Sequence, residues 1–425
     1  MVDAVIAGAG IAGVATAWQL ADRLGATDAV LVDPHPPLSI TSNRPEANYR
    51  DWWPQPAMAE LADLSLDLID ELLADGAQIP MDRRGYLYVT TDPERASSLP
   101  EIVAGRAGLA GAGAEAVGAP GIRADYPHLA HGILAGIYVR RAGSLDTVAL
   151  GRAMLDRAVR HGVTVLPAKV VGVERTGDRV EAVIVESTAG RTTLPANRFV
   201  NAGGPFAMPL LGMAGASLEI ETVLRQKAVF RDEAGVVPRG APFTILLDGQ
   251  ELPWSAAERS ELAGSNDPRI LGPLPGGIHV KPDDTAGPNA IKLGWAWDQK
   301  PSLPVERPAC PPIFPRMVLL GATKALPALG RYLDHPPLLA HEGGFYARVP
   351  DGQPVIGPVG PEGSFVVGAL AGFGAMMAAG AGALAAAWLV ADPPTEVMRA
   401  LAPGRLDAAA YRRAIREGSV GTGEL

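Results

Sequence analysis

The sequence predicts a mixed α/β protein in which a strand–helix–strand unit near residue 3 is completed by segments much later in the chain. Three observations predict this: a glycine-rich turn follows the first apolar run, short alternating runs between residues 163 and 194 interrupt the unit, and a Gly/Ala-rich apolar run covers residues 363–391. The 425 residues are enough for two domains or one large two-lobed unit.

The first turn has the spacing G-x-G-x-x-G, formed by Gly8, Gly10 and Gly13. It lies between the apolar run of residues 3–7, which is of strand type, and residues 11–20, whose apolar residues recur at helical spacing. Gly8 allows a sharp turn, Gly10 lets the backbone approach a pyrophosphate, and Gly13 lets the helix lie close to the strand.

An acidic residue ends the second strand of this unit. Residues 29–32 are apolar, and Asp33 follows them, 20 residues after Gly13. Its carboxylate suits a ribose 2′-hydroxyl, while the helix N-terminus presents N–H groups and a partial positive charge to phosphates. The unit therefore predicts a dinucleotide site without a 2′-phosphate, and it does not by itself distinguish FAD from NAD.

Composition excludes several classes of function. The net charge of −9 disfavours nucleic acid and anionic membranes as main partners. The single cysteine, Cys310, allows no intrachain disulfide and no cysteine-based metal site, and we expect no catalytic role for it. The seven scattered histidines form no H-x-x-x-H pair, so no metal site is predicted.

The apolar run of residues 363–391 is long enough to span a bilayer, but Gly372 and Gly374 interrupt it and no flanking Lys or Arg would orient it in a membrane. A strand, a glycine turn and a buried helix are the better prediction. Because no basic region precedes the first apolar run, we expect no signal peptide, no transmembrane segment and a cytoplasmic location.

Further elements follow from periodicity. Helices are expected over residues 61–74 and 146–161, strands over 85–91, 135–140, 163–166, 199–201 and 290–295, and a β-meander over 169–194. NAD-only dehydrogenases usually complete their nucleotide domain without interruption. The interruption by a meander therefore favours FAD.

Four stretches resemble the FAD-dependent oxidoreductases that include D-amino-acid oxidase, glycine oxidase and monomeric sarcosine oxidase. They are GAGIAG with the downstream LVDP, residues 40–43 leading to 48–53, residues 199–204, and residues 343–380. The resemblance runs from residue 3 to about residue 395. It implies a glutathione-reductase-type Rossmann FAD domain (residues 1–85, 145–222 and 340–425) and an interleaved substrate domain built on a mixed β-sheet (residues 86–144 and 223–339).

The resemblance also implies which residues surround FAD. Val170 would hold the adenine through its backbone, and the helix after Gly374 would point its N-terminus at the flavin pyrimidine. The full set is Gly8, Gly10, Ile11, Ala12, Gly13, Asp33, Pro34, Thr41, Ser42, Asn43, Val170, Ala202, Gly203, Gly204, Gly344, Gly372, Phe373, Gly374, Ala375 and Met376. Gly344 stands where some members have a cysteine that tethers FAD, so non-covalent FAD is expected.

Two usual anchors for a substrate carboxylate are replaced, because Tyr346 stands at the place of an arginine and Met376 at the place of a lysine. Arg50 remains, at a place similar to a substrate arginine of sarcosine oxidase. The predicted substrate residues are Arg50, Tyr49, Trp52, Tyr346, Trp297 and Arg348, with Gln226 and Lys227 as weaker candidates. The predicted catalytic residues are Arg50 and Lys292.

Lys292 is in the middle of an alternating run that resembles the one holding the oxygen-activating lysine of sarcosine oxidase. The alternative is a lysine on the exposed face of a strand. Beside a flavin, its charge would lower the cost of forming superoxide in a dry site.

The expected activity is oxidation of the C–N bond of an amino acid or secondary amine, with hydride transfer to flavin N5. Water would hydrolyse the imine, and O2 would reoxidise the flavin to give H2O2. Three alternatives stay open: a dehydrogenase with another electron acceptor, an enzyme for 2-hydroxy acids, and a flavoprotein subunit of a larger complex. The oligomeric state is left open.

Overall fold

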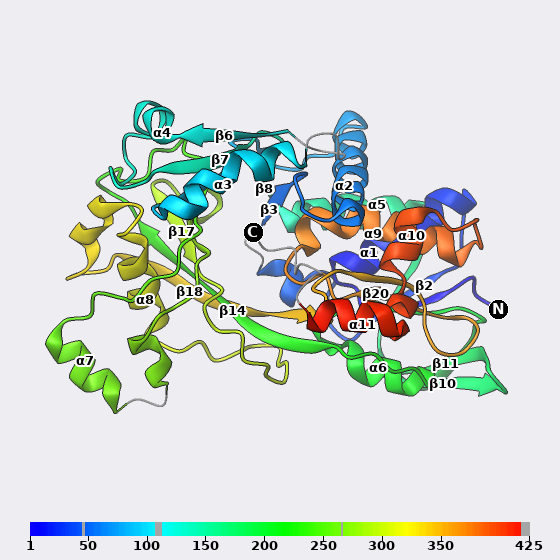
Figure 1. The fold of residues 1–425 in the computed structure, drawn as a ribbon. Coiled ribbons are helices and arrows are strands. Elements are labelled where there is room, and N and C mark those ends of the chain that lie inside the picture. Colours follow the sequence, from blue (N-terminus) through cyan, green and yellow to red (C-terminus); the bar gives the residue numbers. More distant parts are fainter. Residues whose placement is uncertain (45–46, 107–112, 265–266, 418–425) are drawn as a thin grey trace.

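The computed structural model describes residues 1–44, 47–106, 113–264 and 267–417. Helices α1, α5, α9 and α10 gather in one half of the ribbon, and α3, α4, α7 and α8 in the other (Figure 1). The long strands β14 (Glu221–Arg231) and β18 (Leu338–Arg348) run between the two halves.

A six-stranded sheet forms the centre of the first half. Its order is β19 (Val355–Pro358), β20 (Ser364–Gly368), β13 (Phe199–Asn201), β1 (Val5–Ala7), β2 (Val30–Asp33) and β9 (Thr164–Pro167). All neighbours pair in parallel except β19 and β20. The predicted strand–helix–strand unit is therefore confirmed, together with its completion by later segments.

Two helices pack on this sheet, α1 (Ile11–Leu24) and α9 (Gly374–Leu389); α5 (Thr147–Arg160) packs against α1, and α2 (Pro56–Ala74) packs against α9. The Asp146 side chain begins α5 by accepting from the backbone N–H groups of Val148 and Ala149 at 2.9 Å each. The two helices expected over residues 61–74 and 146–161 are thus confirmed, and α2 begins five residues earlier than predicted, with Pro56 in its first turn.

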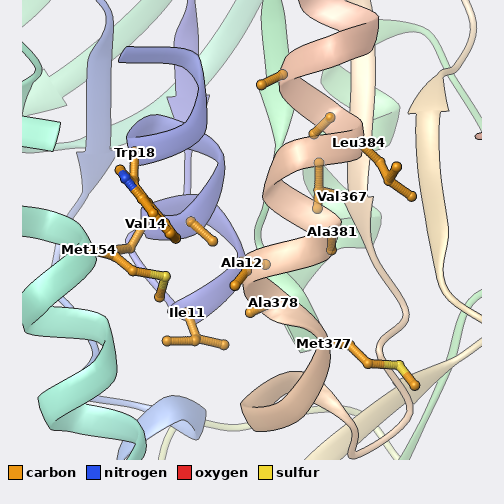
Figure 2. Packing of buried hydrophobic residues seen from close by; sticks show 14 of the residues in the cluster. Ile11, Ala12, Val14, Trp18, Met154, Val367, Met377, Ala378, Ala381 and Leu384 are labelled. Carbon is orange, nitrogen blue, oxygen red and sulfur yellow. The ribbon is translucent and has the colours of Figure 1, made fainter. Parts of the chain in front are cut away.

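Small residues allow α9 to pack in the middle of this half. Figure 2 shows α1 and α9 side by side, with Ala12 and Val14 on one helix and Ala378 and Ala381 on the other. A Cβ at Gly382 would lie 2.5 Å from the Ala15 carbonyl, too close for any side chain. The predicted strand, turn and buried helix are confirmed, and among the described residues no helix is long and apolar enough to cross a membrane.

An eight-stranded sheet dominates the second half. Its order is β18, β14, β17 (Ala290–Gly294), β16 (Ile278–Pro282), β15 (Phe243–Leu246), β5 (Tyr86–Thr90), β7 (Ala135–Val139) and β6 (Ala114–Gly118). β5 and β15 pair in parallel and the other neighbours antiparallel, so the expected mixed sheet is confirmed. The domain limits stay a prediction; β18 begins two residues before the expected limit at residue 340.

The other elements are short. The predicted meander is formed by β10 (Lys169–Thr176), β11 (Arg179–Ser187) and β12 (Gly190–Pro195). A second three-stranded sheet is formed by β3 (Asn48–Arg50), β8 (Ala142–Leu145) and β4 (Met81–Asp82). The remaining helices are α3 (Pro93–Ala104), α4 (Ala119–Asp125), α6 (Ala207–Ala214), α7 (Ala256–Ala263), α8 (Phe314–Ala322), α10 (Glu396–Leu401) and α11 (Ala409–Arg416).

The contact between α1 and α9 gives a first prediction. Replacing Gly382 with Ala forces the two helices apart, which we expect to lower the free energy of unfolding by about 1–3 kcal/mol. The control is Gly212→Ala in α6, where no heavy atom lies within 4 Å of the added Cβ. That variant should gain up to about 1 kcal/mol from helix propensity. Urea unfolding measures both; equal stability of Gly382→Ala and the wild type would contradict the tight contact.

Candidate functional site

A cavity of about 530 Å³ opens between the two halves of the molecule. One end is lined by the first residue of α1, by the short 3-10 helix Thr41–Asn43 and by residues 370–376, which lead into α9. The other end is lined by side chains of β5, β14, β15 and β16 in the eight-stranded sheet. The cavity therefore joins the predicted cofactor region to the mixed sheet.

The glycine turn is packed as tightly as its spacing predicts. Gly8 has a φ of +108°, and a Cβ there would lie 2.4 Å from the Ala202 carbonyl oxygen. A Cβ at Gly13 would lie 1.9 Å from the carbonyl oxygen of Gly8. Neither position accepts a side chain, so α1 begins close to the end of β1 with its N-terminus directed at the cavity.

Polar groups surround this N-terminus. The backbone N–H of Ala9 donates to the Asp33 carboxylate at 2.8 Å, and the N–H of Ile11 donates to the Ser42 hydroxyl at 2.9 Å. The N–H groups of a helix N-terminus suit the diphosphate of a dinucleotide. A carboxylate beside them suits the hydroxyls of its ribose.

A second helix N-terminus reaches the same cavity. α9 begins at Gly374, and a Cβ at Gly374 would lie 3.5 Å from the Ile11 side chain, so the starts of α1 and α9 are adjacent. Gly372 has a φ of +92°, and a Cβ there would come within 2.1 Å of the Tyr346 ring. The Tyr346 ring therefore packs directly on the Gly372 backbone. We call the cavity end lined by residues 370–376 and the starts of the two helices the flavin cradle, and the residues present there fit FAD.

The structure places the predicted cofactor residues in two groups. Those on the cavity wall are Ile11, Thr41, Ser42, Gly344, Gly372, Phe373, Gly374, Ala375 and Met376. Those outside this wall are Gly8, Gly10, Ala12, Gly13, Asp33, Pro34, Asn43, Val170, Ala202, Gly203 and Gly204. Their contacts with FAD stay a prediction.

Arg50 lies at the other end of the cavity and is only 8% exposed. Its guanidinium donates to the Tyr88 hydroxyl at 2.5 Å and to the Trp52 carbonyl at 3.2 Å, and it lies 3.9 Å from the centre of the Trp53 ring. The Trp53 ring in turn meets Phe373 edge-on at 4.6 Å. One chain of contacts thus connects Arg50 to the start of α9.

Of the other five residues in the main predicted substrate set, only Tyr346 lies on the cavity wall. Trp52 is buried, 6.4 Å from Tyr88 between ring centres. Tyr49 donates its hydroxyl to the Asp82 carbonyl at 2.9 Å, and burial raises its pKa to about 12. The structure therefore places both behind the wall, with Tyr49 directed away from the cavity.

Trp297 and Arg348 also lie outside the wall. Trp297 contacts the guanidinium of Arg269, 5.3 Å from its ring centre. Arg348 donates to the Glu221 carboxylate at 2.6 Å and to Gln299. Gln299 itself lines the cavity, so Arg348 lies directly behind the wall, and substrate roles for Trp297 and Arg348 stay a prediction.

Lys292 is buried, so the interpretation as an exposed strand residue is wrong. Its ammonium lies 2.8 Å from the Asp283 carboxylate. Burial alone would raise the pKa of Asp283, but the charge and hydrogen bond of Lys292, the Thr285 hydroxyl and the charge of Lys281 together lower this pKa. Lys292 does not lie on the cavity wall. Its cross-strand neighbour Lys281 donates at 2.6 Å to the side chain of Asn48, and Asn48 does lie on the wall. A role for Lys292 with oxygen stays a prediction.

Several wall residues were missed or given little weight by sequence reasoning. They are Tyr86, Tyr88, Phe243, His279 and Arg225, together with the weaker candidates Gln226 and Lys227. Tyr86 and Tyr88 alternate along β5 and so share one face, a signal that the sequence does contain. The strand order that brings β5 and β14 to one cavity is not visible in any local pattern.

The fold and the cavity define a flavin-dependent oxidoreductase. The model of the DAO family, described as FAD dependent oxidoreductase, matches residues 3–388, so the chain belongs to this family. A search of curated proteins by sequence finds no match.

Solved structures agree in fold. L-proline dehydrogenase from P. horikoshii has a TM-score of 0.76 at 20% identity, with 95% of this chain and 97% of that chain covered. Iminodiacetate oxidase from Chelativorans sp. BNC1 has a TM-score of 0.72 at 20% identity, covering 94% and 98%. Glycine oxidase from Bacillus cereus ATCC 14579 has a TM-score of 0.71 at 16% identity, covering 94% and 98%. At these identities the likeness shows the fold alone.

Asp51, next to Arg50 in the chain, generates a prediction about pH. It is 3% exposed, and burial followed by the nearby Asp63 carboxylate raises its pKa to about 7 from an ordinary 3.8. The native state thus holds this proton more tightly than the unfolded state does. The contribution of this bound proton to the free energy of unfolding is fully present below the pKa of Asp51 in the unfolded state. It is lost as the pH rises through the pKa in the native state.

We therefore expect Asp51→Asn to match the wild type near about pH 4 and to exceed its free energy of unfolding by about 1–4 kcal/mol above about pH 8. Denaturant unfolding across this range measures the difference. The exposed Asp178→Asn is the control and should show no such trend. A pH-independent difference for Asp51→Asn would show that its carboxyl is ionised in the native state.

Proposed function

We propose that the protein oxidises the C–N bond of an amino acid or a carboxylated secondary amine. The observation that carries this proposal is Arg50, a buried cation on the cavity wall that Tyr88 and Trp53 hold in one orientation. A guanidinium in a fixed orientation suits bidentate recognition of a carboxylate. The names of the structural neighbours L-proline dehydrogenase, glycine oxidase and iminodiacetate oxidase support an amino-acid or amine substrate.

The chain's own residues would orient the substrate and exclude water. Arg50 would bind the carboxylate, while Tyr88, Phe243 and Ile245 on the sheet face would form an apolar wall beside the reacting carbon. When bound, FAD would accept a hydride from the carbon next to nitrogen and pass the electrons to O2, giving H2O2. The start of α9 would favour negative charge at the cradle through its free N–H groups.

We propose that FAD is bound without a covalent link. Gly344 lines the cavity and carries no nucleophile, and the single thiol, Cys310, belongs to a Pro-rich segment outside the cavity wall. Acid precipitation should then release all of the flavin into the supernatant, where its absorbance is measured. Flavin retained in the precipitate would contradict this, and Cys310→Ser would test whether that thiol holds it.

The reaction class is tested anaerobically. The holoenzyme is mixed with N-methyl amino acids, D- and L-amino acids, amines and 2-hydroxy acids while the visible absorbance of the flavin is followed, and air is then admitted. Bleaching by an amine or amino acid with fast recovery in air supports an oxidase, and slow recovery indicates a dehydrogenase with another acceptor. Bleaching by 2-hydroxy acids alone would contradict the proposal. Bleaching by no compound would also contradict it, and would favour a flavoprotein subunit of a larger complex.

Arg50 is tested by substitution. Arg50→Ala should weaken apparent affinity for a carboxylated substrate about 10–100-fold, since a hydrogen bond to a charged group contributes about 1.5–3 kcal/mol. Oxidation of the matching amine without a carboxylate should change little, which controls for damage to the cavity. Arg50→Lys should retain part of the affinity. Equal losses with both substrates would contradict carboxylate binding by Arg50.

We also propose that Lys292 promotes the reaction with oxygen. Since Lys292 and Asp283 form a buried pair, the double variant Lys292→Met/Asp283→Asn removes both charges together. We expect slower reoxidation in air with an unchanged anaerobic reduction rate, measured by stopped-flow absorbance. Unchanged reoxidation would contradict the role of Lys292.

A further inference from the structure

Asn48 lies on the cavity wall at the start of β3 and is 7% exposed. Because side chains alternate along a strand, Asn48 and Arg50 share the face that meets the cavity, whereas Tyr49 between them is directed to the Asp82 carbonyl. The strand itself is held by the backbone, which pairs Asn48 with Ser144 of β8. The Asn48 side chain is therefore not what forms the strand, and the proposed function gives it no task.

The buried Lys281 fixes the direction of the Asn48 amide. Its ammonium donates to the side-chain oxygen Oδ1 of Asn48 at 2.6 Å. An ammonium has donors and no acceptor, so it can bond to the oxygen of an amide but not to its nitrogen. Oδ1 therefore faces Lys281, and the nitrogen Nδ2, with its two N–H groups, lies on the opposite side of the amide.

The amide nitrogen of Asn48 is available to a ligand. Within the part of the chain that the structure describes, Nδ2 makes no hydrogen bond and is not sealed from solvent. Because the side chain lines the cavity, its N–H groups are open to the cavity. Serine or aspartate could also accept from Lys281, but neither would present an amide N–H on the other side. The feature that asparagine adds here is thus a fixed pair of donors.

These donors lie beside the flavin cradle. β3 packs against α9, and Trp53, three residues after β3, meets Phe373 at the start of α9. A flavin that has accepted a hydride carries negative charge. Fixed N–H donors stabilise such a charge strongly in a site that excludes water, because they need no reorganisation when the charge appears. The N-terminus of α9 favours the same charge.

We propose that Asn48 donates a hydrogen bond to the reduced flavin and stabilises its negative charge, with Lys281 as the positioning residue that keeps the amide in this direction. The bond from the ammonium also strengthens the amide as a donor, because linked hydrogen bonds polarise one another. Such a donor favours the reduced, anionic flavin over the oxidised, neutral flavin and so raises the reduction potential. This role needs FAD and no particular substrate, so it goes beyond the proposed function.

The test measures the reduction potential of the flavin in the holoenzyme, by slow anaerobic reduction beside a reference dye. Asn48→Leu removes the donors and should shift the equilibrium toward oxidised flavin at least about tenfold, the factor that one hydrogen bond to a charged group supplies. For a two-electron couple, this factor is a shift of about 30 mV to more negative potential. Asn48→Asp keeps an acceptor for Lys281 without the N–H donors, and should shift the potential at least as far. An unchanged potential in either variant would overturn the proposal.

The control is Asn289→Asp, which makes the same chemical change at an exposed turn outside the cavity wall and should leave the potential unchanged. Acetate binding to the oxidised holoenzyme, read from the flavin absorbance, separates flavin from substrate as the partner of Asn48. Weaker acetate binding by Asn48→Leu at an unchanged potential would assign the donors to the substrate and contradict the role at the flavin.

A double-variant cycle tests the positioning role of Lys281. If Lys281 acts through Asn48, Lys281→Met should shift the potential in the wild type and much less in the Asn48→Leu background. Lys281→Gln keeps a donor for Oδ1 and should restore part of the shift. Equal shifts by Lys281→Met in both backgrounds would show that the lysine acts through its charge alone, and would contradict the positioning role.

These results are separable from the proposed function, because no amine takes part in the measurement of the potential. Were no amine to bleach the flavin while the Asn48 variants shifted the potential, the proposed oxidation would fail and the role of Asn48 would stand. Were amines to bleach the flavin while the variants kept the wild-type potential, the oxidation would stand and the role of Asn48 would fail.

Discussion

The contact between α1 and α9 is the constraint on which the site depends. The helices approach closely because glycine and alanine lie where they meet, and this approach brings their N-termini to the same cavity. Two positive helix ends side by side repel each other unless negative charge lies between or beyond them. The arrangement therefore favours an anionic ligand even before any side chain is considered, and a dinucleotide supplies that charge.

The substrate end and the cofactor end of the cavity are lined by different kinds of groups. The cofactor end consists largely of backbone and small residues, so its shape follows from glycine positions and helix starts. The opposite end consists of long side chains on the face of the mixed sheet, among them Arg50 from β3 and Arg225 from β14. Side chains there can change without moving the backbone that surrounds the cofactor, which separates substrate choice from flavin binding.

Local sequence patterns predicted the elements that contacts between neighbouring residues in the chain determine. The spacing of Gly8 and Gly13, the alternation in residues 85–91 and the acid at the start of α5 each specify an element through contacts close in sequence. The order of strands in the eight-stranded sheet depends on contacts between segments far apart, so His279 and Arg225 could not be assigned to one cavity. Lys292 shows the limit most plainly, because alternation indicated a strand but could not reveal the buried Asp283 beside it.

The position of α9 in the chain has a consequence for folding. α1 and α9 are separated by most of the sequence, yet each buries its apolar face on the other. Long-range contacts of this kind form late and slowly, because the intervening chain must first be ordered. During synthesis, the N-terminal strand–helix–strand unit must wait for nearly the whole chain before its core can close. Until then the face of α1 that α9 covers stays exposed, as does the uncharged α9 before it docks, which makes this step open to aggregation.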